Sequence, residues 1–215
     1  MKPLRLFFAI WPPDAVRKVL WRSMAPMRDA LPSVRWVPPD RLHITLRFMG
    51  DVPAGLVPRL VSAAEALDLV APFDVELAGT GTFPGRGPPR IYWVGVRSRL
   101  LPGLRTSLDR ALAREGLDHE GRIFRPHLTV GRSNRGRSGR GGPMRGKAVT
   151  TPDLAFSVAA IHLVRSDLRP GGPRYTNVHR AILGTGDPRT SPASPAERDA
   201  DSLHGLRQEN GRADG

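Results

Sequence analysis

Cysteine is absent from this chain of 215 residues, and its absence excludes several kinds of site. Disulfide bridges, zinc ribbons, iron–sulfur clusters and thiol nucleophiles all require that side chain. Long hydrophobic runs are also missing, so no segment of the sequence is long enough to span a membrane. The first apolar stretch, 4–11, contains Arg5 and ends at Pro12 without a small-residue cleavage site. We interpret it as a strand rather than a signal peptide and expect a cytoplasmic protein.

Acidic residues are the scarcer charge, with 20 Asp and Glu against 33 Lys and Arg and a formal net charge of +13. Such a balance favours polyanionic partners, nucleic acid first. Only 3 of the 33 basic residues are lysine. Because a GC-rich genome also favours arginine, the charge by itself is weak evidence for a partner.

Composition divides the chain at about residue 184. Hydrophobic residues make up 40% of the whole, enough for a substantial core. Residues 184–215, however, are rich in Gly, Pro, Ser and mixed charge, with Leu203 and Leu206 as their only large aliphatic side chains. We predict one folded domain over 1–183 and a disordered tail over 184–215. The tail holds four Arg and six acidic residues, so the positive charge belongs to the domain.

Within 1–183 the patterns of hydrophobic residues predict strands alternating with helices. One helix is expected over 14–31 and is bent or ended early by Pro26, and a strand over 42–49 stops at Gly50. A loop is expected over 79–89, and one late strand over 154–164. The strands are expected to be antiparallel, which predicts an α+β fold rather than a Rossmann fold.

A short pattern occurs twice and carries the functional prediction. His43-Ile44-Thr45-Leu46 reappears as His127-Leu128-Thr129-Val130, and in both copies His and Thr alternate with apolar residues. Because side chains alternate between the two faces of a strand, each His and Thr share one face while the apolar residues enter the core. Each copy therefore presents one imidazole and one hydroxyl together.

Two such imidazoles suit the opening of a 2′,3′-cyclic phosphate. One can act as the base that activates water, and the other as the acid that protonates the departing sugar oxygen. The hydroxyls of Thr45 and Thr129 can donate hydrogen bonds to phosphate oxygens as negative charge develops. The alternative is a pair of ordinary surface His-x-Thr segments repeated by chance. The residues alone leave these two interpretations about equal.

The chain resembles the two-histidine phosphoesterases, and within them the bacterial and archaeal RNA 2′,3′-cyclic phosphodiesterases, also called 2′-5′ RNA ligases. The resemblance covers nearly all of 1–183 and rests on five segments. These are 5–10, 43–50, 92–96, 124–132, and 165–168 with Tyr175.

That resemblance implies a bilobal fold with pseudo-twofold symmetry, in which antiparallel sheets line a central cleft, helices lie outside and each lobe supplies one motif. It implies that His43 is the proton donor to the leaving oxygen and His127 the proton acceptor that activates water. The expected reaction is metal-independent hydrolysis of RNA 2′,3′-cyclic phosphodiester ends to 2′-phosphomonoesters by a monomer, without a cofactor. Two alternatives stay open: a phosphodiesterase acting on small cyclic or 2′-5′ linked nucleotides, and a non-catalytic basic module that binds RNA.

Several further residues are candidates for binding the substrate. Strict alternation places Arg47 on the face of His43 and Arg125 on that of His127, where either guanidinium could bind a phosphate. Phe48, Phe83 and Trp93 could stack on a base, although aromatic residues on strands usually belong to the core.

The region after the second motif departs from the family pattern. Residues 133–147 hold five basic residues and no acidic one, and they are either a clamp on an RNA backbone or a solvated surface loop. No two histidines of the sequence have metal-ligand spacing with a nearby carboxylate, so we predict no metal.

Overall fold

The structure is a computed structural model, and it describes residues 2–67, 70–85, 88–117, 123–133 and 154–184. Its helices are α1 (Asp14–Ser23), α2 (Ala25–Ala30), α3 (Val57–Glu65) and α4 (Leu101–Arg114), with short 3-10 turns at Pro39–Arg41 and Ala54–Leu56. Its strands are β1 (Leu4–Ile10), β2 (Val34–Trp36), β3 (Ile44–Val52), β4 (Phe73–Phe83), β5 (Ile91–Arg97), β6 (His127–Ser133), β7 (Leu154–Val158), β8 (Ala160–Asp167) and β9 (Arg174–Ile182).

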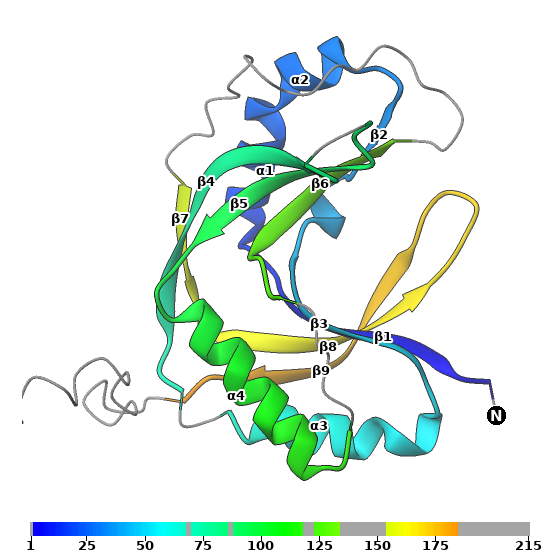
Figure 1. The fold of residues 1–215 in the computed structure, drawn as a ribbon, viewed down its shortest axis with the longest axis vertical. Coiled ribbons are helices and arrows are strands. Elements are labelled where there is room, and N and C mark those ends of the chain that lie inside the picture. Colours follow the sequence, from blue (N-terminus) through cyan, green and yellow to red (C-terminus); the bar gives the residue numbers. More distant parts are fainter. Residues whose placement is uncertain (1, 68–69, 86–87, 118–122, 134–153, 185–215) are drawn as a thin grey trace, which may run out of the picture.

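The strands form a curled antiparallel sheet in the order β7-β4-β5-β6-β3-β1-β8-β9, and β2 pairs with β6 (Figure 1). The order is symmetric about its centre, because each motif strand is followed outward by three further strands. The two halves meet where β3 pairs with β6. The expected α+β, bilobal, pseudo-twofold fold is therefore confirmed.

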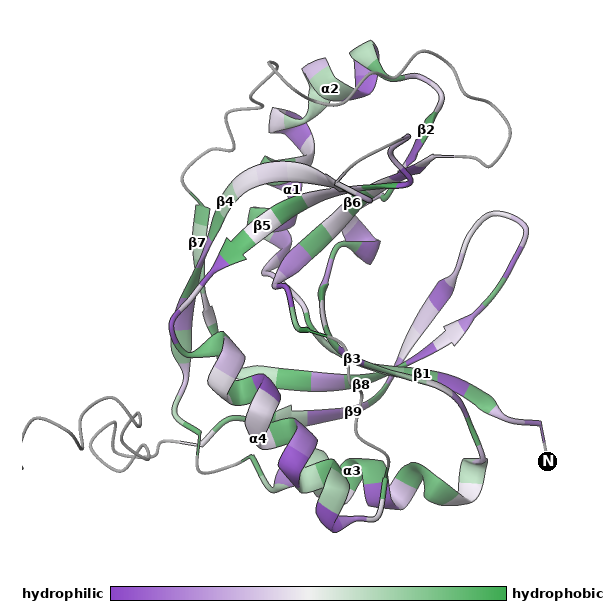
Figure 2. Ribbon diagram, in the orientation of Figure 1, coloured by the Kyte–Doolittle hydropathy of each residue, from purple (hydrophilic) through white to green (hydrophobic). Residues whose placement is uncertain are grey.

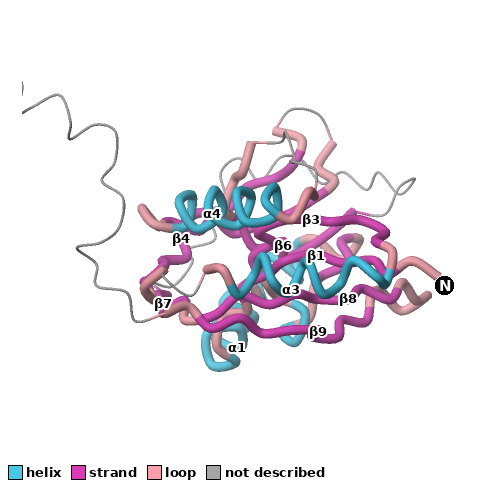
Figure 3. The backbone as a smooth tube through the Cα atoms, turned by 90° about the horizontal axis from the view of Figure 1, so that it is seen from below, coloured by secondary structure: helices cyan, strands magenta, loops and turns pink. Residues whose placement is uncertain are grey.

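The helices lie outside the sheet and close its core. Hydrophobic and hydrophilic bands alternate along the strands and helices (Figure 2), as expected for elements with one buried face. Leu60 of α3 and Leu104 and Leu108 of α4 are buried in the same core as Phe8 and Leu46 of the sheet. Seen from below, α3 lies in front of β8 and β9 (Figure 3). Within the described part of the chain, no helix is long and apolar enough to cross a membrane.

Several element boundaries differ from the expected ones, and glycine explains two of them. Strand β3 continues through Gly50, whose φ of +73° is accessible to glycine at little cost. Strand β4 continues to Phe83 through the segment expected to be a loop. There Gly79 has a φ of +69°, and a Cβ at Gly81 would lie 2.1 Å from the Trp93 ring. These glycines allow the strand to pass through a register shift and against an indole.

Two other differences concern where elements are interrupted. The helix expected over 14–31 is divided into α1 and α2, and Pro26 lies in the first turn of α2, where a missing N–H costs little. The single strand expected over 154–164 is two strands, β7 and β8, which belong to opposite halves of the sheet. The expected tail begins at Gly184, and its other residues lie outside those described.

Candidate active site

The two motifs meet at their second residues. Ile44 of β3 pairs with Leu128 of β6, and both side chains are fully buried in the core. Paired residues of antiparallel strands share a face, whereas neighbours along a strand point to opposite faces. The His and Thr on either side of each apolar residue therefore lie together on the other face of the sheet. We call this the histidine face, and its central residues are His43, Thr45, His127 and Thr129.

The backbone holds both imidazoles in the same way. Nδ1 of His43 lies 2.7 Å from the carbonyl oxygen of Arg41, and Nδ1 of His127 lies 2.6 Å from that of Arg125. Since a carbonyl can only accept a hydrogen bond, Nδ1 must carry the hydrogen in both rings. The other nitrogen, Nε2, is then left to accept a proton when the ring is neutral or to donate one when it is charged.

Three aromatic rings surround His43. The ring centroids of Phe7, Trp11 and Tyr175 lie 5.0, 5.2 and 5.2 Å from that of the imidazole. Burial among them disfavours the charged imidazolium and lowers the pKa of His43 to about 4, although the hydrogen bond to the Arg41 carbonyl opposes this shift.

Two basic side chains of the other half of the sheet act in the same direction. The charges of Arg132 and His127, both on β6, contribute to lowering the pKa of His43. Arg132 also favours the ionised form of Tyr175, whose pKa is raised overall by burial. Because such interactions weaken with distance, they place Arg132 and His127 near His43 and its aromatic neighbours. The fold thus brings the two predicted histidines together.

Fewer rings surround His127. Phe83, at the end of β4, lies 5.3 Å from its imidazole in an edge contact, and Trp93 of β5 lies 6.5 Å away. The two aromatic rings also contact each other at 5.5 Å. Phe83 and Trp93, which the sequence marks as candidates for base stacking, therefore line the neighbourhood of the second motif.

Each motif strand contains a bulge immediately after its threonine. In β3, Thr45 lies opposite Ala9 and Arg47 lies opposite Phe8, so Leu46 has no partner in β1. A bulge of this kind inserts one extra residue and resets the alternation of side chains. As a result Arg47 shares the face of Phe8, which belongs to the core, and not that of the histidine.

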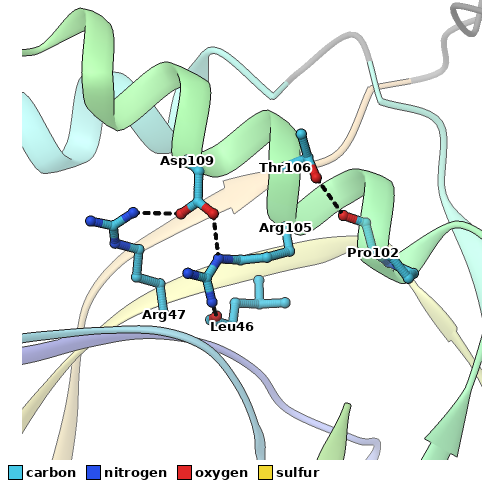
Figure 4. Close-up of polar contacts among 6 residues, drawn as sticks. All are labelled: Leu46, Arg47, Pro102, Arg105, Thr106 and Asp109. Carbon is cyan, nitrogen blue, oxygen red and sulfur yellow. Dashed lines mark hydrogen bonds and ion pairs between the residues drawn. The ribbon is translucent and has the colours of Figure 1, made fainter. Parts of the chain in front are cut away.

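Arg47 accordingly lies in the core rather than at the site. Its side chain is 4% exposed, and its Nη1 atom forms an ion pair with Asp109 of α4 at 2.5 Å (Figure 4). Arg105 of α4 completes the cluster, with Nε donating to Asp109 and Nη1 to the carbonyl of Leu46. The expected placement of Arg47 beside His43 is therefore wrong, because strict alternation does not hold across the bulge.

The second motif repeats this arrangement. Thr129 lies opposite Trp93 and Gly131 opposite Tyr92, so Val130 is the extra residue. The bulges therefore turn Phe48 and Arg132, one residue later than strict alternation predicts, toward the histidine face. The position of Phe48 agrees with this orientation, because Phe48 lies opposite Phe7, which is a neighbour of His43.

The other predicted site residues have the following surroundings. Thr45 and Thr129 are partly buried on the histidine face, and their contribution to binding stays a prediction. The side chain of Arg125 is exposed and precedes β6, and its contribution to binding stays a prediction. Of the loop 133–147, Ser133 alone is within the described residues.

The motif argument did not single out several neighbours of the site, among them Trp11, Arg41 and Arg132. Trp11 could have been found from the sequence, because it continues the alternation of Phe7 and Ala9 along the first strand. Alternation along a strand does not point to Arg41 or Arg132. The position of Arg41 depends on a 3-10 turn, and that of Arg132 depends on the bulge in β6. Among the described residues, no group of three or more His, Cys, Asp or Glu side chains could hold a metal ion.

Comparisons with known proteins identify the family of this chain. The family model described as "2'-5' RNA ligase superfamily" matches residues 12–170. An RNA 2′,3′-cyclic phosphodiesterase of Thermus thermophilus is 33% identical over 204 residues, which are 91% of this chain and 98% of that protein.

Solved structures show the same fold. A crystal structure of a Thermus thermophilus protein has a TM-score of 0.71 at 30% identity, covering 85% of this chain and 99% of the other. A structure of E. coli LigT complexed with 3′-AMP has a TM-score of 0.64 at 29% identity, covering 84% and 98%. With a family match over most of its length and these relatives, the chain belongs to the 2′-5′ RNA ligase superfamily.

Proposed function

We propose that this protein hydrolyses the 2′,3′-cyclic phosphate at the end of an RNA to a 2′-phosphomonoester. The observation that carries the proposal is the pair of imidazoles, each holding its Nδ1 hydrogen on a backbone carbonyl and leaving Nε2 free on one face of the sheet. A protein that merely binds RNA has no need of two histidines oriented in this way. The Thermus thermophilus relative is named for this activity.

The reaction proceeds in one exchange of bonds at phosphorus. Nε2 of His127 accepts a proton from water as the water oxygen bonds to phosphorus. The bond from phosphorus to the 3′ oxygen breaks, and Nε2–H of His43 donates its proton to that oxygen. Atoms and protons balance without a cofactor, and the two imidazoles exchange their protonation states in each turnover.

Three further side chains stabilise the charge that develops on the phosphate. The hydroxyls of Thr45 and Thr129 donate hydrogen bonds to the non-bridging oxygens, and the guanidinium of Arg132 adds a positive charge on the same face. Because these donors are held by the sheet before the substrate arrives, they need little reorganisation during the reaction.

Because the pKa of His43 is low, the bound substrate itself must raise it before the ring can act as a proton donor. At neutral pH the free protein holds His43 uncharged, since its pKa is about 4. A cyclic phosphate brings a negative charge beside the ring and offsets the cationic influence of Arg132, so the pKa rises. Substrate binding is therefore coupled to proton uptake at the donor.

The test is incubation with a short RNA that ends in a 2′,3′-cyclic phosphate, with chromatography and mass spectrometry of the product. We expect a 2′-phosphomonoester, a bell-shaped dependence of kcat/KM on pH and full activity in EDTA. A 3′-phosphomonoester would contradict the assignment of the leaving oxygen. Loss of activity on chelation, with recovery on adding a divalent ion, would contradict the metal-free mechanism.

We also propose that the protein acts as a monomer in the cytoplasm. Both histidines come from one chain, so the site needs no second copy to be complete. Sedimentation analysis and cell fractionation test these two points.

A further inference from the structure

A basic wedge opens where two neighbouring strands diverge. Strands β1 and β8 pair from Ala9 and His162 as far as Leu6 and Arg165, and beyond that point β1 continues along β3 alone. The N-terminal end of β1 and the β8–β9 hairpin then separate (Figure 1). A cavity of about 590 Å³ lies between them, within the range of sites that hold ligands the size of a nucleotide. Its charged residues are Lys2, Arg5, Asp51, Arg165, Asp167 and Arg169.

Within the described part of the chain, two of the four cations in the wedge have no acidic partner. Arg5 lies 4.0 Å from Asp51, and Arg165 lies 2.8 Å from Asp167. The acidic residues are thereby matched, and both Lys2 and Arg169 are exposed. Among the described residues neither of these two forms an ion pair. They leave the wedge with an excess of two positive charges, which favours an anionic occupant.

Arg5, which lines the wedge, is linked to the site of the proposed reaction through Phe48 and Phe7. Phe7 contacts His43 at 5.0 Å, and Phe48 lies directly opposite Phe7 on the neighbouring strand. The guanidinium of Arg5 lies 4.6 Å from the ring centroid of Phe48, which is 42% exposed. An aromatic side chain with an arginine against it is the kind of surface on which a base of a single strand stacks.

We infer that the wedge binds the RNA strand that precedes the cyclic end, with one base on Phe48 and the backbone phosphates farther from the cyclic end on Lys2 and Arg169. The inference deepens the proposed function and rests on it, because it makes an oligonucleotide, rather than a mononucleotide, the preferred substrate. A mononucleotide occupies the space between the histidines and cannot extend to the wedge.

The same face offers a matched control. Arg180 is exposed and lies in one row of paired residues across the sheet with Thr45 of the first motif. The row runs from Thr45 through Ala9 and His162 to Arg180. It is thus a cation on the histidine face of the same half of the sheet, but beyond β8 and away from the wedge. An RNA strand bound by positive charge alone would depend on Arg180 as much as on Arg169.

The first experiment compares two substrates, a trinucleotide and a mononucleotide that end in the same 2′,3′-cyclic phosphate. We expect the double variant Lys2→Ala/Arg169→Ala to lower the ratio of their kcat/KM values about tenfold, with Arg180→Ala leaving the ratio as in the wild type. Phe48→Ala should lower the ratio by a similar factor, about tenfold, through lost stacking. An unchanged ratio in both the double variant and Phe48→Ala, or an equal loss in Arg180→Ala, overturns the inference.

A second experiment separates the inference from the proposed reaction. Fluorescence anisotropy measures binding of a labelled trinucleotide that already ends in a 2′-phosphate, at several salt concentrations. Loss of two phosphate contacts should reduce the slope of log K against log salt by about 1.4 in the double variant. If this loss is found but the cyclic end is never cleaved, the binding site stands and the proposed function fails. If cleavage occurs and the slope is unchanged, the wedge is refuted and the proposed function stands.

Discussion

The two motif copies are alike along the backbone and different in what surrounds them. In both, the burial of five successive residues follows the same order, with His and Thr partly exposed and the next two residues after Thr buried. Both have an imidazole held on the carbonyl two residues earlier, and both have a bulge after the threonine. The repeat in the sequence is therefore a repeat of local geometry, including a feature that the motif letters do not express.

The two bulges are stabilised by different partners. In β3 the carbonyl of Leu46 accepts a hydrogen bond from Arg105, a side chain of α4. In β6 the carbonyl of Val130 accepts one from the backbone N–H of Val37, just after β2. An unpaired carbonyl in the core would be costly, so each half needs a donor, and the fold supplies one from a helix and the other from the residue that follows β2.

The two histidines differ in enclosure. Three rings lie around His43 and two around His127, and burial lowers the pKa of His43 to about 4. A symmetric backbone thus carries an asymmetric pair, as a reaction with one acid and one base requires. The free protein's neutral His43 would suit a base, and under the proposed mechanism it becomes a donor only with an anion beside it.

The largest expected effect comes from removing either imidazole. His43→Ala and His127→Ala should each lower kcat by about 10²–10⁴-fold, because each removes one of the two proton transfers. The double variant should lose far less than the product of both factors, since the two groups act as a unit. His162→Ala, on the same face but outside the motifs, is the control. Near-normal turnover in either single variant would show that the copies are not a catalytic pair.

The next effect concerns the residue that follows each bulge. Arg47→Ala should lower the free energy of unfolding by about 3 kcal/mol, because it removes a buried cation that pairs with the carboxylate of Asp109. In the second copy, Gly131→Ala should cost about 2 kcal/mol, since its Cβ would lie 2.7 Å from Cγ1 of Val34. Urea denaturation measures both losses, with exposed Arg97→Ala as the control. A raised KM with unchanged stability in Arg47→Ala would instead restore that residue to the substrate.

Arg47 also shows how far the sequence could predict the site. The repeated His-x-Thr pattern identifies both strands and the face that carries the imidazoles, because period-two alternation is local. The bulge after each threonine depends on donors from α4 and from Val37, which lie far along the chain. Alternation therefore fails at the residue after the bulge, and it is the charge of Arg132, on the other motif strand, that acts on His43.

The fold was predictable to a similar depth. Hydrophobic periodicity locates the helices and most strands, but it does not reveal that 79–83 continues β4. That segment is a strand because Gly81 admits the ring of Trp93, a contact with a different strand. The order of the strands likewise depends on long-range pairing, which the family resemblance could supply and the composition could not.

A smaller effect tests whether the two threonines are equivalent. Thr45→Val and Thr129→Val keep the shape of the side chain and remove the donor, so each should lower kcat by about 10- to 100-fold. Steady-state kinetics measure the change, and Thr176→Val, on exposed β9, is the control. A loss confined to one threonine would show that the transition-state charge lies against one motif rather than between the two.

The smallest effect is a shift in the pKa of His43, and its measurement tests directly whether the two histidines differ in enclosure. NMR titration of His43 in the free protein should give a pKa of about 4, and inorganic phosphate should raise it. Trp11→Ala should also raise it toward 6.5, because water reaches the ring. Since the unfolded chain binds this proton below pH 6.5 and the folded chain only near pH 4, stability falls as pH drops through that interval. His43→Gln should reduce the fall. If His43 titrates near 6.5 in the free protein, the aromatic enclosure does not distinguish the two copies.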